Sequence, residues 1–291
     1  MMLLRAWQHP VTRHGRFGAY ARYLAWKIST SIVSGPVLIP FVNETLLLAE
    51  PLSRETRELS LLVLKDPEAM AFVAHFLRGG EYFVDVGASI GSYAVLAAAT
   101  ADACVTAFEP EPGRAALLRR NVALNGLGAR IDCRELAVAE VPGRLEAFWS
   151  STRRLPLPLR VATPKCAPVA VVRLDDVRLA GRPALARVDV GGDELAVLRG
   201  AHATLGCPSL CAVIVGADRE HVLDDEQPEL VRTILERHGF VPTDYDPWSR
   251  RLLRPERVRV PMIYVRLRQA EHIVRRLAQA AGIWVNASLC V

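Results

Sequence analysis

Two acidic side chains stand at positions where the sequence could bind a small ligand. Asp85 lies near the end of an apolar run and is followed by Gly87 and Gly91, and Glu109 follows a second apolar run. Glycines after a buried parallel strand expose backbone at the carboxyl edge of the sheet, where a ligand can approach closely. A carboxylate at the tip of the neighbouring strand can accept hydrogen bonds from both hydroxyls of a ribose. The two acids therefore predict a ligand with a ribose and a cationic or amino group.

The spacing of the two glycines narrows the choice of ligand. It reads Gly-x-x-x-Gly, whereas most dinucleotide sites carry Gly-x-Gly-x-x-Gly and a phosphate loop carries Lys-Ser/Thr. This disfavours a pyrophosphate or triphosphate ligand and, with it, an NAD-dependent oxidoreductase. The two acids and the glycines, in this order, form the arrangement that S-adenosylmethionine requires. We expect the cofactor contacts to come from Asp85, Gly87, Ala88, Ser89, Gly91, Glu109, Pro110, Ala137 and Asp189.

These motifs resemble the FkbM-type family of S-adenosylmethionine-dependent methyltransferases. The resemblance covers roughly residues 80–215 and is carried by the segments 83–93, 107–112, 117–125, 172–177 and 187–201. It implies a class I methyltransferase fold and methyl transfer, usually to a hydroxyl oxygen of a sugar or natural product, with S-adenosylhomocysteine as the second product. Two positions depart from the family pattern. Gly191 stands where the family has Glu, and Gly216 ends a strand that commonly ends in an acid.

O-methylation needs a positioned methyl donor, an acceptor oxygen in line with it and a group that takes the acceptor proton. Asp189, at the end of a predicted strand, is the first candidate base. Its alternative role is structural, as a cap of the following helix or a contact of the cofactor's amino group. His221 is the second candidate base, against the alternative of an ordinary loop histidine. We predict no metal site and interpret the acids over 218–226 as a solvated loop.

Strands alternate with helices from residue 81 onward, which predicts a doubly wound, mostly parallel α/β sheet. The last two strands have no helix between them and predict an antiparallel hairpin at one edge. A Pro- and Arg-rich loop over 150–168 interrupts the alternation, either as a lid or as a surface insertion. The expected strands are 81–86, 103–108, 130–133, 145–148, 185–190, 210–215, 240–245 and 262–266. The expected helices are 18–33, 67–78, 90–100, 113–125, 194–205, 228–238 and 269–281.

We expect a methyltransferase domain over 60–267, with a partly helical extension at 1–59 and a C-terminal helix and tail at 268–291.

The net charge of +5 is uneven along this chain. Residues 1–43 hold five basic and no acidic residues, and 250–276 hold nine Arg and two Glu. The remaining segment 44–249 has 22 basic and 29 acidic residues, a net of −7. This excludes a polyanion-binding surface along the whole chain.

Two other functions stay open at this point. A non-catalytic protein could bind the same cofactor, and the two substituted glycines would then mark lost chemistry. Nucleic-acid methylation is a weaker alternative, because the chain lacks the Asn-Pro-Pro-Tyr type of motif that base-amino methyltransferases use. The six Cys are scattered without a Cys-x-x-Cys pair, and no secretory signal opens the chain, so we expect a cytoplasmic protein.

Apolar residues recur every fourth position near the start of the chain. Tyr20, Leu24, Ile28 and Ile32 predict a basic amphipathic helix. With Trp7, Tyr20, Tyr23 and Trp26 as interfacial aromatics, this segment could contact an anionic membrane peripherally. Alternatively, the helix packs its apolar side on the domain or on a partner subunit. The C-terminal helix and tail are further candidates for homodimer contacts.

Overall fold

The computed structural model describes residues 16–32, 35–51, 53–145, 168–216, 227–255, 261–286 and 289–291. The candidate base His221, the acids beside it and almost all of the predicted loop 150–168 lie outside these residues.

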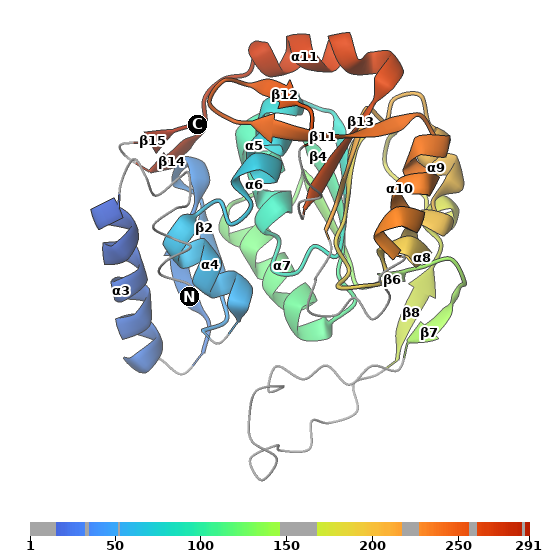
Figure 1. Cartoon of the computed structure of the whole chain (residues 1–291). Coiled ribbons are helices and arrows are strands. Elements are labelled where there is room, and N and C mark those ends of the chain that lie inside the picture. The colour runs from blue at the N-terminus through green and yellow to red at the C-terminus, as the bar shows by residue number, and fades with distance from the viewer. Residues whose placement is uncertain are drawn as a thin grey trace.

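A mostly parallel sheet of eight strands forms the centre of the described chain (Figure 1). In spatial order its strands are β12 (Arg251–Leu253), β11 (Phe240–Asp246), β13 (Met262–Arg266), β10 (Ala212–Val215), β9 (Pro183–Val188), β3 (Tyr82–Val86), β4 (Cys104–Phe108) and β5 (Ile131–Arg134). The strands from β10 to β5 pair in parallel, whereas β13 is antiparallel to both β10 and β11. This confirms the predicted fold class. The last predicted strand does not stand at the edge: it inserts between β10 and β11, and β12 forms the outermost hairpin with β11.

Helices cover both faces of the sheet (Figure 1). One face carries α5 (Pro67–Phe76), α6 (Ser92–Ala101) and α7 (Pro112–Leu124), and the other carries α8 (Glu194–Arg199), α9 (His202–Gly206) and α10 (Gln227–Arg237). Phe83 of β3 packs in the apolar cluster with α5, α6 and α7, and Val84 and Val86 pack in the cluster with α8, α9 and α10. Because strand side chains alternate between faces, Asp85 lies on the α6 side with Phe83. β3 is thus buried on both faces, as its short run without polar alternation predicts.

The helix predicted over 194–205 is two helices, α8 and α9, separated at Gly200 and Ala201. A Cβ on Gly200 would lie 2.4 Å from the carbonyl oxygen of Ala139, so the chain approaches its neighbour too closely for a side chain. Ala139 directly follows a strand of a small sheet that the sequence did not reveal. Its strands, in the order β6, β8 and β7, are β6 (Ala137–Val138), β8 (Val169–Val172) and β7 (Gly143–Leu145), and the 3-10 helix η3 (Leu174–Asp176) follows β8.

An N-terminal hairpin is attached to α7 by two asparagine side chains. The hairpin consists of β1 (Val37–Pro40) and β2 (Leu46–Ala49), joined by the 3-10 helix η1 (Val42–Glu44). Asn121 accepts from the Leu48 N–H at 2.6 Å and donates to the Leu48 carbonyl at 3.0 Å. Asn125 does the same for Leu46, at 3.0 and 2.8 Å. The two amides therefore act as a further strand beside β2, which gives these motif asparagines a structural role.

The helix predicted near 18–33 is α3 (Arg16–Ile32), but it packs with a different face than expected. Trp26 is 8% exposed and stacks near Tyr23, with ring centroids 5.4 Å apart. Arg22 donates to the Leu61 carbonyl at the end of α4 (Arg54–Leu62) at 3.4 Å. Trp26 is thus a packing residue and not an interfacial one. No helix in the described parts of the chain is long and apolar enough to cross a membrane.

The C-terminal segment packs beside the start of β3. The 3-10 helix η4 (Leu267–Gln269) leads into α11 (Ala270–Ala278), and a short hairpin follows, β14 (Trp284–Asn286) and β15 (Leu289–Cys290). Arg276 of α11 donates from both Nη atoms to the Glu81 carboxylate, from Nη1 at 2.8 Å. Arg78 also donates to the Arg276 carbonyl at 2.5 Å. These bonds tie α11 to the amino-terminal edge of the sheet.

Candidate functional site

A buried ion cluster joins the carboxyl ends of β3 and β9. Arg187 is the cross-strand neighbour of Asp85, and its Nη1 donates to Asp85 Oδ1 at 2.8 Å. Its Nη2 donates to Asp189, which lies two residues further on and therefore on the same face. Asp85 is fully buried and Arg187 is 3% exposed, whereas the Asp189 side chain is 32% exposed. The cluster therefore contains one fully buried carboxylate, Asp85, and one partly exposed carboxylate, Asp189.

The two oxygens of Asp85 have different surroundings. Oδ1 accepts from Arg187, but Oδ2 is buried and has no hydrogen-bond donor among the described residues. Burial raises the pKa of Asp85, and the Arg187 guanidinium opposes this shift. For Arg187, burial opposes the charged form, but Asp189 and Asp85 outweigh it and raise the pKa of the guanidinium. A buried carboxylate oxygen without a donor is a position where an N–H group of a ligand can bind.

The ring of Tyr93, a residue of α6, packs against this cluster. The Arg187 guanidinium is 4.1 Å from the centre of its ring, a cation–π distance. Its hydroxyl donates to Asp66 Oδ2 at 3.1 Å. Asp66 stands at the N-cap position of α5, but its side chain caps no backbone N–H. Its carboxylate instead fixes the tyrosine ring under Arg187.

The loop between β3 and α6 is folded by three residues with positive φ. Gly87 has φ +84°, Gly91 has φ +91° and Ser89, between them, has φ +53°. A Cβ on Gly91 would lie 2.5 Å from a methyl carbon of Leu118 in α7, so only glycine fits there. The N–H groups of Gly87 and Ala88 both donate to the Phe108 carbonyl at 2.9 Å. These contacts seat the loop against the end of β4, as the sequence predicts.

Glu109 is held at the same edge by backbone donors. The Ser89 N–H donates to Oε2 at 2.8 Å and the Glu111 N–H donates to Oε1 at 2.9 Å. The residue is 5% exposed, and this burial raises its pKa to about 7, although the two N–H donors oppose the shift. Glu109 is therefore a carboxylate that changes charge near neutral pH unless a ligand supplies further donors.

A partly buried acid from the N-terminal segment contacts this loop, and the sequence did not single it out. Glu55 of α4 accepts from Ser89 Oγ at 2.6 Å and from Ser92 Oγ at 2.9 Å. Lys65 pairs with it at 2.9 Å. Burial opposes its ionisation, but Lys65 and the two hydroxyls outweigh burial and lower the pKa of Glu55 to about 2. α4 thus fixes the conformation of the glycine loop from outside the motif region.

Two glycines leave the space that Asp189 occupies. A Cβ on Gly87 would lie 2.0 Å from the Asp189 carbonyl oxygen, and a Cβ on Gly216 would lie 2.3 Å from its side-chain Cγ and Oδ1. The Asp189 N–H donates to the Val86 carbonyl at 2.9 Å, which draws the ends of β3 and β9 together. Gly216 therefore gives Asp189 room to reach Arg187.

Replacing Gly216 with alanine should force Asp189 out of its ion pair. The added Cβ overlaps the carboxylate, so Arg187 loses one of its two partners in a buried setting. We expect a loss of about 1–3 kcal/mol in the free energy of unfolding, measured by urea denaturation. Gly206→Ala is the matched control, because a Cβ there meets nothing within 4 Å. Equal stability of the two variants would contradict this account of Gly216.

The second departure from the family pattern, Gly191, lies in a tight turn. Gly191 has φ +78° and Gly192 has φ +125°, conformations that side chains rarely adopt. The N–H groups of Val190, Gly191 and Gly192 all donate to Glu194 Oε1, at 3.0, 3.0 and 3.2 Å. Glu194, at the start of α8 and 3% exposed, therefore shapes the turn that follows Asp189.

The structure brings most of the predicted site together. Asp85, the loop 87–91, Glu109 and Asp189 lie at one edge of the sheet, and Pro110 directly follows Glu109. Ala137 belongs to the small three-stranded sheet, in β6, where it pairs with Val171 of β8, and its predicted cofactor contact stays a prediction. His221 lies outside the described residues, so its predicted role stays a prediction.

The sequence did not single out Arg187, Glu55, Lys65 or Tyr93. A signal for Arg187 was present, since a charged residue interrupts an otherwise apolar buried strand two positions before Asp189. Glu55 and Lys65 carried no comparable signal, because an acid in a polar helix and a lysine in the connection after it are ordinary surface residues.

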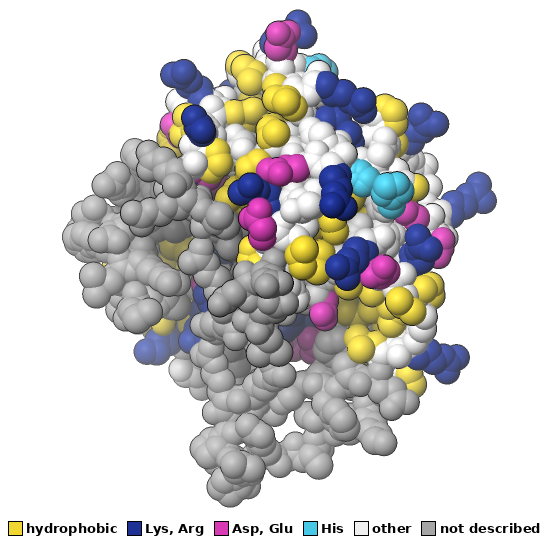
Figure 2. All heavy atoms as spheres, turned by 45° about the vertical axis from the view of Figure 1, so that its right-hand side comes forward, with side chains coloured by type: hydrophobic (Ala, Val, Ile, Leu, Met, Phe, Trp, Pro, Cys, Tyr) yellow, Lys and Arg dark blue, Asp and Glu magenta, His cyan; other side chains and the backbone are white. Residues whose placement is uncertain are grey.

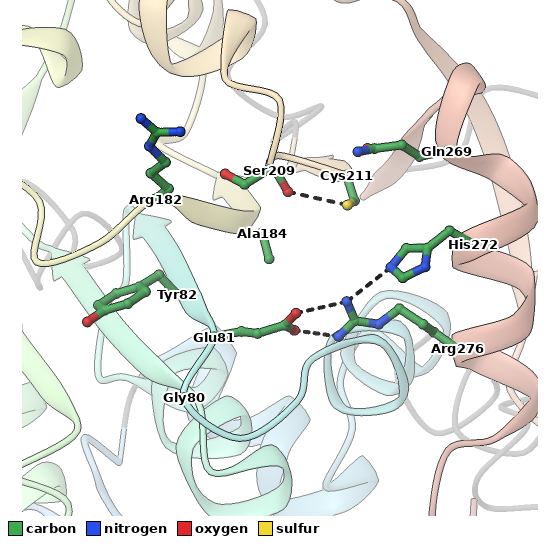
Figure 3. A pocket seen from close by; sticks show the side chains of 10 residues that line it. All are labelled: Gly80, Glu81, Tyr82, Arg182, Ala184, Ser209, Cys211, Gln269, His272 and Arg276. Carbon is green, nitrogen blue, oxygen red and sulfur yellow. Dashed lines mark hydrogen bonds and ion pairs between the residues drawn. The ribbon is translucent and has the colours of Figure 1, made fainter.

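A separate hollow of about 430 Å³ opens at the opposite edge of the sheet, where β3 and β9 begin (Figure 3). Figure 3 shows the Glu81 carboxylate bonded to the Arg276 guanidinium in the lining of this hollow, with His272 beside them on α11. Arg276 is already engaged by Glu81, and the hollow contains none of the predicted cofactor residues. We assign it no part in the candidate site.

The charged groups of the described residues bear on two further kinds of site, a metal centre and a nucleic-acid surface. Among the described residues, no group of three or more His, Cys, Asp or Glu side chains could hold a metal ion. On the face drawn in Figure 2, the described Lys and Arg side chains are scattered among acidic and apolar ones. A nucleic-acid backbone binds where such cations gather into one patch or stripe.

The sheet order with one inserted antiparallel strand, together with the glycine loop and the acid after the next strand, defines a class I methyltransferase. The family model described as "Methyltransferase FkbM domain" matches residues 85–242. The chain belongs to this family and is an S-adenosylmethionine-dependent methyltransferase. A search of curated proteins found no match.

Solved structures with a similar fold are distant in sequence. A precorrin-6Y C5,15-methyltransferase from Geobacter metallireducens is 14% identical, with 69% of this chain and 86% of that chain covered and a TM-score of 0.40. M. jannaschii TYW2 in complex with AdoMet is 14% identical, with 80% and 85% covered and a TM-score of 0.43. A geranyl diphosphate methyltransferase in complex with SAM is 13% identical, with 65% and 70% covered and a TM-score of 0.41.

Proposed function

We propose that this methyltransferase transfers the methyl group of S-adenosylmethionine to a hydroxyl oxygen of a sugar or small natural product. One observation carries the proposal: the buried, donor-free Oδ2 of Asp85 lies in the same ion cluster as the partly exposed carboxylate of Asp189. The first suits the amino group of the cofactor. The second is accessible to an acceptor hydroxyl.

The charge of the cluster fits a cationic ligand. Four carboxylates, those of Glu55, Asp66, Asp85 and Asp189, interact with two cations, Lys65 and Arg187. S-adenosylmethionine carries an ammonium, a sulfonium and one carboxylate, so its net charge is positive and complements this excess of acid. In the proposal, Asp85 accepts from the ammonium and Glu109 accepts from the ribose hydroxyls.

Asp189 is proposed to take the acceptor proton. The cofactor supplies a methyl group on a positively charged sulfur, and the bond to that sulfur breaks with its electron pair left on sulfur. As the acceptor oxygen forms the new bond to carbon, its proton must leave. Arg187 engages Asp189 Oδ2 and holds the carboxylate in place, so Oδ1 is the oxygen that can accept this proton. Asp85, Glu109 and the loop contribute by positioning, which supplies most of the rate in an in-line transfer.

Asp189→Asn tests this assignment. We expect a loss of roughly 10²- to 10⁴-fold in kcat, because an amide holds the same geometry but accepts a proton poorly. The measurement is formation of S-adenosylhomocysteine over a panel of sugars, polyols and phenols, with binding of S-adenosylhomocysteine followed by calorimetry. Asp193→Asn, an exposed acid in the same turn, is the matched control.

The outcomes separate the functions that the sequence left open. Retained turnover in Asp189→Asn would remove Asp189 as the base and leave the methyl transfer intact. Cofactor binding without turnover on any member of the panel would instead favour the non-catalytic alternative.

A further inference from the structure

The outer face of α3 carries three large apolar side chains in one line. Leu24, Ile28 and Ile32 are spaced by four residues, so they lie on one side of the helix. They are 59%, 52% and 77% exposed, whereas Trp26 on the opposite side is 8% exposed. Ala21 and Ala25, on the same outer side, are also exposed. An apolar stripe of this kind, which follows the last three turns of the helix, marks a surface that binds something.

The charge around the stripe is of one sign. Every charged residue of α3 is basic, namely Arg16, Arg22 and Lys27, and no acidic residue precedes Glu44 in the sequence. Arg22 donates to the Leu61 carbonyl of α4 and so lies on the packed side of the helix. Lys27 is exposed next to the stripe. A helix with an apolar face and flanking cations is the kind that lies in the plane of an anionic membrane surface.

The polar groups near the stripe are satisfied within the helix. The Ser29 hydroxyl donates to the Ala25 carbonyl at 2.9 Å, and the Ser31 hydroxyl donates to the Lys27 carbonyl at 2.8 Å. The last turns of α3 can therefore leave water without exposing unpaired hydroxyl donors to an apolar medium. The helix also forms one outer edge of the molecule, so a flat surface can reach it (Figure 1).

A second copy of the chain fits this face less well. The stripe offers on the order of a few hundred Å², below the roughly 800 Å² per partner of a standard protein interface. A two-fold dimer would also place the same basic residues of both copies beside each other, since both subunits contribute the same patch. A lipid surface with negative headgroups complements both the apolar stripe and the exposed Lys27.

We propose that α3 docks this protein onto an anionic lipid surface through Leu24, Ile28 and Ile32, with Lys27 at the headgroups. This inference is independent of the proposed acceptor and of the assignment of Asp189. It concerns a helix lying on a membrane and not one that crosses it.

Co-sedimentation of the full chain with vesicles tests the proposal. The vesicles are phosphatidylcholine alone or an equal mixture of phosphatidylcholine and phosphatidylglycerol. We expect binding to the anionic vesicles that weakens with salt, and a partition coefficient at least about tenfold lower for the triple variant L24S/I28S/I32S. Lys27→Glu should weaken binding to the anionic vesicles only.

Leu267→Ser and Val274→Ser form the matched control. Both residues are exposed apolar side chains, 63% and 47% accessible, in the basic C-terminal segment. These changes should leave vesicle binding as in the unmodified chain.

Equal pelleting of the unmodified chain and the triple variant would overturn the proposal. A dimer in light scattering that the triple variant converts to monomer, without vesicle binding, would also overturn it and assign the stripe to a second copy. If the triple variant melts at the same temperature as the unmodified chain, its loss of vesicle binding is due to the changed helix surface and not to unfolding.

Discussion

Arg187→Leu should cost about 3–5 kcal/mol of the free energy of unfolding, because it removes the cation between two acids in a buried cluster. Asp85 is fully buried and would lose the donor to Oδ1 while Oδ2 already has none among the described residues. Leucine fills part of the space but leaves the carboxylate without compensation. Urea denaturation followed by tryptophan fluorescence measures the loss.

The protein contains a matched control for this prediction. Arg130 and Asp102 form an ion pair at 2.6 Å, but their side chains are 38% and 64% exposed. Arg130→Leu should therefore cost less than about 1 kcal/mol, since water screens the pair. The destabilisation by Arg187→Leu should also shrink toward low pH, because the raised pKa of Asp85 favours its neutral form there. Equal losses in the two variants would show that the cluster is not the buried network described above.

Glu109→Gln should weaken binding of S-adenosylhomocysteine by about 10- to 100-fold, the effect of losing hydrogen bonds to a charged group. Glutamine preserves the shape of the side chain and can still accept from the Ser89 N–H, so the loop should stay in place. Glu111→Gln is the control, because its carboxylate pairs with Arg114 at 2.7 Å and only its backbone N–H contacts Glu109. Calorimetry measures the dissociation constants, and an equal effect of the two variants would contradict a ribose contact at Glu109.

The same residue predicts a pH dependence with opposite signs for stability and for binding. The pKa of Glu109 in the fold is about 7, raised by burial from 4.5, so the folded chain holds an extra proton between these values. The stability contribution of Glu109 is therefore complete below pH 4.5 and is lost as the pH rises through 7. Ribose hydroxyls donate to the ionised form, so affinity should fall by about tenfold from pH 8 to pH 6. Glu109→Gln should lack both dependences.

Local patterns in the sequence were sufficient for the framework of the site. Glycines directly after an apolar run, with an acid before them and another after the next run, determine a strand, a tight loop and a carboxylate at one sheet edge. The structure confirms the parallel sheet and places Asp85, Ser89 and Glu109 together. These features depend on neighbours within a few residues, so the sequence reveals them directly.

Contacts between site residues that lie far apart in the sequence depend on the tertiary structure. Arg187 meets Asp85 across 102 residues because the register of β9 against β3 makes them cross-strand neighbours. Glu55 meets Ser89 across 34 residues because α4 packs on the glycine loop. The spacing of apolar residues indicates only which side of a helix or strand is buried. It determines neither the register of β9 against β3 nor the place where α4 packs.

The helix α3 shows the same division most clearly. Leu24, Ile28 and Ile32 recur at every fourth position, and this spacing determined that the segment is a helix with an apolar side. Which side meets the protein depended on the surface offered by α4 and the N-terminal hairpin, and there Trp26 is buried while the regular stripe is left outside. Periodicity follows from the geometry of one helix, whereas burial follows from the shape of what surrounds it.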